Sequence, residues 1–215
     1  MYNGRVNVGG PADVRKLPAL VISKLAVGPY DNNAYLLRCT ATGASLLIDA
    51  AAEPERLLTL VPTEGLDYVL TTHRHADHWQ ALAEIVEATG ARTLAGRIDA
   101  ADIPVPTDRL LSDGDTMRLG EVEVNFIELS GHTAGSISVH YDDPTGHGHL
   151  FTGDCLFPGG IGRTLSDAEF DSLIEGVERR FFSLDDETWV YPGHGHDTTI
   201  GAERPQLAEW RLRRW

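Results

Sequence analysis

The feature that most constrains this chain is a cluster of ionisable side chains at residues 71–78, which read Thr-Thr-His-Arg-His-Ala-Asp-His. Three imidazoles and one carboxylate fall within the six residues from His73 to His78. A polar helix start with Asp77 as its cap would explain only that one residue. Imidazole nitrogen and carboxylate oxygen together suit Zn²⁺, Mn²⁺ or Fe²⁺. We therefore expect a metal site here, in a fold that can build one from a loop.

The first half of the chain has the apolar patterning of an antiparallel meander. Apolar runs at residues 20–22, 34–37 and 45–48 are separated by turn residues, as expected for successive strands. A helix at residues 54–61, a strand at 68–71 and a helix that starts near His78 follow. The histidine-rich loop thus lies between a predicted strand and a predicted helix.

The second half repeats this order of strands followed by helices. Alternating apolar residues at 122–126 and 137–141 predict two half-buried strands, and a third covers residues 149–152. Ser166 and Glu169 have the spacing of a capping box, which predicts the start of a helix whose apolar stripe reaches Phe181. A last strand at residues 188–191 precedes a C-terminal helix that ends at Trp215.

These patterns predict one α/β domain over residues 17–215, with layered sheets and helices outside them. Residues 1–16 are rich in Gly and Asn and lack periodicity. We expect them to form a flexible N-terminal tail without chemistry.

Charge and composition exclude several classes of partner. The chain carries 18 basic and 32 acidic residues, and its formal charge of −14 repels phosphate backbones and anionic lipid headgroups. We therefore expect no nucleic acid and no membrane among its partners. The first residues lack a secretory pattern, and the chain has only two cysteines, Cys39 and Cys155. We therefore expect a cytoplasmic protein with free thiols. We also expect it to be either a monomer or a homodimer.

Three further candidate ligands each follow a predicted strand directly: His132, Asp154 and His194. If the strands lie side by side, the loops that follow them converge on one sheet edge, where loops commonly hold active sites. Glycines flank all three positions and permit close approach of the backbone to a ligand.

The motifs His73-x-His75-x-Asp77-His78, Gly131-His132-Thr133, Gly153-Asp154 and Pro192-Gly193-His194-Gly195 together resemble the metallo-β-lactamase-fold superfamily, and within it the glyoxalase II-like hydrolases. The resemblance extends from about residue 20 onward. It implies a four-layer αβ/βα sandwich with a dinuclear metal site at one edge. It also implies the ligands: a first metal on His73, His75 and His132, a second on Asp77, His78 and His194, and a bridging Asp154.

The same resemblance implies a reaction. Two cations that share a water lower its pKa from about 15.7 to roughly 7, which provides hydroxide at neutral pH. We expect this bridging hydroxide to cleave a small acyl thioester, with Asp77 and Asp154 as the catalytic carboxylates. The expected cofactors are two divalent metal ions, with zinc as the first choice and iron or manganese as alternatives.

Two features differ from glyoxalase II proper. The chain ends about twenty residues after His194, which leaves no room for the helical extension that supplies glutathione-binding residues in that family. Arg163 stands where the family has a basic residue for the carboxylate of the thiol, but Leu165 replaces the aromatic residue that follows. Arg163 is a candidate substrate-binding residue, and a surface ion pair is an equally good interpretation.

The main alternative is a persulfide dioxygenase, which resembles the same motif set and uses one iron bound by two histidines and an aspartate. That family shares the Gly162-Arg163-Thr164 segment but usually continues with an acidic residue and phenylalanine, which this chain lacks. A β-lactamase would need export, and a nuclease would need a basic surface. A purely structural metal site would be closed and tetrahedral, with no use for a second ligand set.

Overall fold

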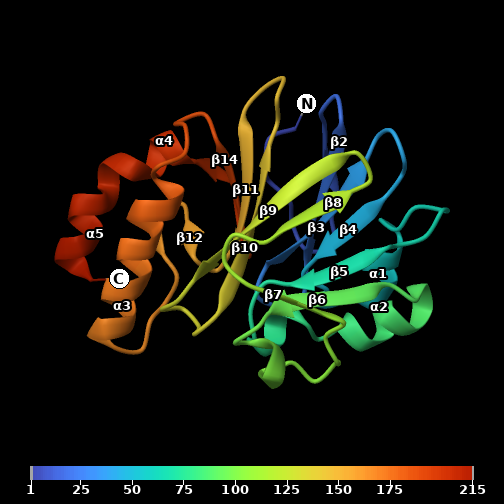
Figure 1. Ribbon diagram of the computed structural model, residues 1–215, viewed down its shortest axis with the longest axis horizontal. Helices are drawn as coiled ribbons and strands as arrows, with labels where there is room; N and C mark the ends of the chain where they lie inside the picture. Colours follow the sequence, from blue (N-terminus) through green and yellow to red (C-terminus); the bar gives the residue numbers. More distant parts are fainter. Residues whose placement is uncertain (1, 215) are drawn as a thin grey trace.

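Two β-sheets pack face to face in the computed structural model, which describes residues 2–214, and helices cover the outer side of each sheet (Figure 1). Helices α1 (Pro54–Leu58) and α2 (Leu82–Thr89) lie on the first sheet. Helices α3 (Asp167–Gly176), α4 (Ile200–Glu203) and α5 (Leu207–Arg213) lie on the second. This helix–sheet–sheet–helix order confirms the expected four-layer α/β sandwich.

The first sheet contains strands β1 to β7 in sequence order. Its first four strands are antiparallel, as the meander pattern predicts, whereas β4 to β7 are parallel. Parallel neighbours need a crossover connection, and α1 and α2 provide two of them. The strands are β1 (Asp13–Lys16), β2 (Leu20–Val27), β3 (Asn32–Cys39), β4 (Ser45–Ile48), β5 (Tyr68–Thr71), β6 (Arg92–Gly96) and β7 (Arg109–Leu111).

The second sheet has the strand order β15-β14-β11-β10-β9-β8. Strands β11 and β14 are parallel, and the crossover between them carries α3 and a short hairpin of β12 (Leu156–Phe157) and β13 (Gly160–Ile161). The sheet strands are β8 (Thr116–Leu119), β9 (Val122–Leu129), β10 (Ser136–Asp142), β11 (Gly148–Gly153), β14 (Trp189–Pro192) and β15 (Thr198–Thr199).

Successive side chains of a strand point to opposite faces of its sheet, so they pack into two different cores, one between the sheets and one under the helices. In β3, Tyr35 and Leu37 face the second sheet while Leu36 faces the helices. Phe151 of β11 lies in the core between the sheets and stacks on Tyr191 at a centroid distance of 4.5 Å. This central core fixes the two sheets relative to one another, and with them the loops at their edges.

The N-terminal segment differs from the expected tail. Asp13–Lys16 forms the edge strand β1, which pairs with β2 from Asp13↔Lys24 to Lys16↔Val21. Tyr2 packs edge-on against Trp189 at a centroid distance of 6.0 Å. Trp189 lies far along the chain, and neither this contact nor the pairing with β2 shows in the local Gly- and Asn-rich composition. The proposed domain boundary at residue 17 therefore cuts through a paired region.

Other differences concern short elements. The sequence patterns do not predict β6, β7 or β8, which have three to five residues each. The helix expected near His78 begins at Leu82, after a 3₁₀ turn at Ala76–His78. The C-terminal helix α5 ends at Arg213, and Trp215 lies outside the described residues. Within residues 2–214, no helix has both the length and the apolar character that crossing a membrane requires.

Replacement of Phe151 by Ala tests the importance of the core between the sheets. The side chain is fully buried and contacts Tyr35 and Tyr191, so we expect its removal to lower the free energy of unfolding by about 3–5 kcal/mol. Urea denaturation followed by tryptophan fluorescence measures this. Leu212→Ala is the control, because Leu212 is 87% exposed and its loss should change stability by less than about 0.5 kcal/mol. Equal effects of the two variants would contradict this assignment of the core.

Candidate metal centre

Loops that follow strands of both sheets meet at one edge of the sandwich. The segment 72–79 follows β5, and Asp154 and His194 follow the parallel strands β11 and β14. His132 lies in the loop between β9 and β10. The structure therefore brings together all seven ligand candidates that the sequence motifs predict.

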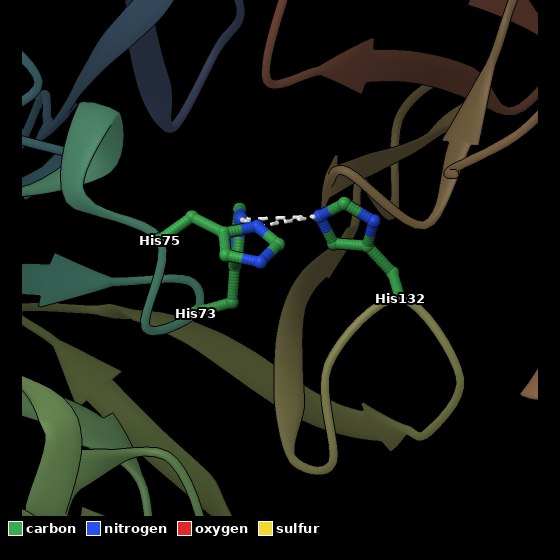
Figure 2. Close-up of side chains that lie close together, drawn as sticks. All are labelled: His73, His75 and His132. Carbon is green, nitrogen blue, oxygen red and sulfur yellow. Dashed lines mark hydrogen bonds between the residues drawn. The ribbon is translucent and has the colours of Figure 1, made fainter. Parts of the chain in front are cut away.

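His73, His75 and His132 turn their rings toward one another (Figure 2). His73 Nε2 lies 3.0 Å from His75 Nδ1 and 3.3 Å from His132 Nε2, and the last two nitrogens are 3.0 Å apart. A tetrahedral zinc ion with Zn–N bonds of about 2.0–2.1 Å separates its nitrogen ligands by about 3.3 Å. The triangle of nitrogens thus has the size that one cation requires. We call these three residues the triad.

Asp77, His78 and His194 form a second group beside the triad. Asp77 Oδ2 lies 3.6 Å from His78 Nε2 and 3.4 Å from His194 Nε2. These separations exceed good hydrogen-bond lengths but suit donors around a common ion. We call these three residues the second group.

Asp154 lies between the two sets. Its Oδ1 is 3.4 Å from His78 Nε2, and its Oδ2 is 3.4 Å from His194 Nε2 and 3.6 Å from His132 Nε2. One carboxylate therefore contacts a member of the triad and two members of the second group.

Two buried atoms of this cluster lack a hydrogen-bond partner among residues 2–214: His78 Nε2 and Asp154 Oδ1. A buried polar atom without a partner costs free energy, so native structures almost always satisfy it. A divalent cation would satisfy both atoms at once. The donor set of imidazole nitrogens and carboxylate oxygens fits such ions, and the His/Asp clusters imply divalent metals.

Electrostatics favours the ligand forms of His73, Asp77 and Asp154. Burial, reinforced by the nearby His78, holds the pKa of His73 well below its usual range, so the ring is neutral. The contact with the His194 ring lowers the pKa of Asp77, against the effect of burial. Burial opposes ionisation of Asp154, but the charge of His78 and the contact with His194 hold its pKa well below the usual value. Burial opposes protonation of His78 and His194, but the nearby carboxylates raise the pKa of His78 well above its usual value and that of His194 to about 10, so a cation would displace a proton from each of these two rings. Neutral imidazole and ionised carboxylate are the forms that bind metals.

The ring nitrogen that points away from the cluster has its own acceptor in four of the five histidines. Such outer contacts fix the tautomer and orientation of a metal ligand. His78 Nδ1 donates to Asp49 Oδ2 at 2.8 Å, His194 Nδ1 to Tyr30 O at 2.8 Å, His132 Nδ1 to Arg163 O at 2.9 Å, and His73 Nδ1 lies 3.0 Å from Thr72 Oγ1.

Asp49 is a functional candidate that the motifs did not identify. Besides the bond from His78, it accepts hydrogen bonds from the Thr72 amide at 2.8 Å and the Thr72 hydroxyl at 2.9 Å. Its backbone is left-handed, with φ of 59°, which is uncommon outside glycine. Asp49 directly follows β4, so the rule that pointed to Asp154 after β11 could have found it. The backbone acceptors at Tyr30 and Arg163 carry no sequence signal.

Arg163 lies one contact away from the cluster. Its carbonyl holds His132, while its exposed guanidinium has no hydrogen bond or ion pair within the described residues. The side chain lines a cavity of about 290 Å³ together with Ile161, Thr164 and Arg214. A second cavity of about 320 Å³ is lined by His75 and His132 and by Leu165, and gives access to the triad.

Known proteins resemble this chain over most of its length. The family described as Metallo-beta-lactamase superfamily matches residues 27–194. A hydroxyacylglutathione hydrolase of Cereibacter sphaeroides is 36% identical over 166 residues, which are 76% of this chain and 62% of the relative. The chain thus spans about three fifths of the length of that relative.

Two solved structures are also similar. ETHE1 from Myxococcus xanthus shares 31% identity with a TM-score of 0.76, over 87% of this chain and 84% of the other. The protein TTHA1623, solved in a di-iron-bound form, shares 35% identity with a TM-score of 0.68, over 84% of this chain and 96% of the other.

Asp49→Ala tests whether the contact to His78 tunes metal binding. Loss of the carboxylate frees the His78 ring, and such outer contacts contribute about 10–100-fold to metal affinity. We therefore expect at least one metal to bind about 10-fold more weakly or worse, as measured by competition with a chelator. Asp171→Ala is the matched control, because its exposed carboxylate pairs with Arg214 at the surface and lies on helix α3, away from the ligand loops. Unchanged affinities in Asp49→Ala would argue against this role.

Proposed function

The chain belongs to the metallo-beta-lactamase superfamily, and from that premise we propose that it is a binuclear metal-dependent hydrolase that cleaves a small acyl thioester. The observation that carries the proposal is the position of Asp154, which contacts both the triad and the second group. The relatives named hydroxyacylglutathione hydrolase support the thioester as the substrate class.

In this proposal the triad holds one divalent ion, the second group holds the other, and Asp154 bridges them. Zinc is the first choice, with iron or manganese as alternatives, because all three accept imidazole and carboxylate ligands. The di-iron form of TTHA1623 supports a site for two ions. When bound, a pair of such ions lowers the pKa of water to roughly 7 and polarises a carbonyl group.

The residues of the chain provide charge and orientation for this chemistry. Asp77 and Asp154 each add one negative charge, which offsets the charge of two dications. Asn32 Nδ2 donates to Asp77 Oδ2 at 3.0 Å and so fixes the direction of that carboxylate. The cavity beside His75 and His132 is the route by which a substrate carbonyl would approach.

Arg163 is the proposed anchor for an anionic group of the substrate. Its guanidinium is free of ion pairs within residues 2–214, which favours this role over the surface ion pair considered from the sequence. Arginine binds a carboxylate through two parallel hydrogen bonds. Leu165 is 82% exposed beside it and offers an apolar contact. We propose a small thioester with a carboxylate on its acyl or thiol part.

The proposal includes a cytoplasmic location and a monomer or homodimer. The free thiols of Cys39 and Cys155, which are both buried, support the cytoplasmic location. A persulfide dioxygenase with one iron remains the second candidate, favoured by the similarity to ETHE1 from Myxococcus xanthus. The second group argues against a dioxygenase, because a single iron bound elsewhere would leave the ligand atoms of this group without a function.

Metal content and thioester hydrolysis test the main proposal together. We expect two metal equivalents per chain, and loss of hydrolysis when a chelator removes them. Asp154→Asn should lower kcat/KM by more than about 100-fold, since even outer contacts of metal ligands are worth about 10–100-fold. Asp142→Asn, an exposed change at the end of β10, is the control. One equivalent of iron, with oxygen uptake in the presence of a thiol persulfide, would instead establish the dioxygenase.

Arg163→Gln tests the anchor separately from the chemistry. Loss of a bidentate contact should raise KM for a carboxylate-bearing thioester by about 10-fold and leave kcat within about 2-fold. A thioester without the carboxylate is the control substrate, and its KM should not change. Arg5→Gln, also exposed but in the N-terminal segment, is the control variant. A fall in kcat without a change in KM would show that Arg163 has a different role.

A further inference from the structure

Lys24 in β2 is a fully buried lysine whose three N–H groups are all satisfied. Its Nζ donates to Asp197 Oδ1 at 2.6 Å, to Gly195 O at 2.7 Å and to Gly4 O at 2.8 Å. The side chains of Lys24 and Asp197 are 0% and 1% exposed, so the pair is almost completely removed from water.

Stability alone does not account for such a pair. Removing two charges from water is costly, and well-packed apolar side chains of similar volume often stabilise a fold equally well or better. The contacts that Lys24 makes are therefore more informative than its contribution to folding. Two of its three acceptors, Gly195 and Asp197, lie within three residues after His194 in the chain.

The loop that carries His194 is held by strands of the opposite sheet. Asn33 Nδ2 donates to Pro192 O and to Gly195 O, both at 2.9 Å, and the Asn33 amide donates to Gly193 O at 2.7 Å. The Tyr35 hydroxyl donates to Pro192 O at 2.7 Å. The β3 contacts reach no further along the loop than Gly195, whereas Lys24 also holds Asp197. Lys24 thus fixes the part of the loop that follows the proposed ligand.

The N-terminal segment covers the Lys24–Asp197 pair on its other side. The Asp197 amide donates to Gly4 O, the carbonyl that Lys24 also binds, and the Tyr2 hydroxyl donates to Asp197 Oδ2. Solvent is therefore excluded from the pair by residues that the sequence assigns to a tail. An ion pair that is buried in this way holds its geometry tightly, because neither charge has an alternative partner in water.

We propose that Lys24, paired with Asp197, is a positioning residue for His194 and thereby sets the metal affinity of the second group. His194 Nε2 lies 3.4 Å from both Asp77 Oδ2 and Asp154 Oδ2, so a shift of the loop would change both separations. The triad lies on other loops and should be much less affected. The inference rests on the proposed binuclear site.

Two variants test the proposal. Lys24→Met keeps the length of the side chain but removes its donors. The double variant Lys24→Met/Asp197→Leu removes both charges, so no unpaired charge remains buried. Zinc affinities of both equivalents are measured by chelator competition, and the spectra of the cobalt-substituted protein report the geometry of each site. Thermal unfolding of the metal-free protein reports stability.

We expect one zinc equivalent to bind about 10-fold less tightly or worse in both variants, and the other to change by less than about 3-fold. Only one part of the cobalt spectrum should change. Leu20→Ala is the control, since it creates a cavity in the same strand without touching the loop, and should lower thermal stability without a selective effect on one site.

Wild-type affinities for both equivalents in the double variant would overturn the inference. Equal weakening of both equivalents, in proportion to a loss of stability like that of Leu20→Ala, would also overturn it and show a merely structural role. If the wild-type protein itself binds fewer than two equivalents, the proposed binuclear function fails instead. The two failures are therefore distinguishable.

Discussion

The site depends on one constraint. Imidazole nitrogens and carboxylate oxygens from both sheets are buried together, and the protein does not supply a hydrogen-bond partner for each of them. Asp154 lies among the rings of His78, His132 and His194, and its Oδ1 and His78 Nε2 have no hydrogen-bond partner in the described part of the chain. A protein interior tolerates such an arrangement only if something satisfies the donors. The geometry of the cluster is thus informative about the ions it binds, because the same donors would be destabilising without them.

The packing of the two sheets holds this polar cluster in place. The apolar core between the sheets packs β5 of the first sheet against the second sheet, in which β11 and β14 are parallel neighbours, so the loops after these three strands converge at one edge. The contacts that orient the ligands come from the same strand ends: Asp49 follows β4, and Thr72 follows β5. The first sheet also fixes a loop of the second sheet, because Lys24, Asn33 and Tyr35 all bind the segment that carries His194. The cluster is therefore a property of the two sheets together.

The sequence predicts the ligand candidates better than their surroundings. Seven residues could be identified because each lies just after a predicted strand and beside a glycine or within one dense motif, which are local signals. Asp49 has the same position after a strand but stands alone, without neighbouring histidines to draw attention to it. The carbonyls of Tyr30 and Arg163 have no side-chain signature at all. The order of the N-terminal segment has no local signal, because its side-chain partners Trp189 and Asp197 are distant in sequence and composition reports only local preferences.

Metal ligands are easier to predict from sequence than the residues that orient them, and the reason is physical. A metal ligand must have a particular donor atom, so its chemistry restricts the residue type and leaves a pattern in the sequence. A residue that orients a ligand needs only to place some donor or acceptor correctly, and backbone, hydroxyl, amide or ammonium groups all serve. Lys24 illustrates the second kind, since a lysine in the middle of β2 has no meaning until the loop beyond His194 is placed beside it. The candidate metal ligands of the chain can therefore be inferred from its sequence, whereas the proposed effect of Lys24 on the second group depends on contacts that only the fold creates.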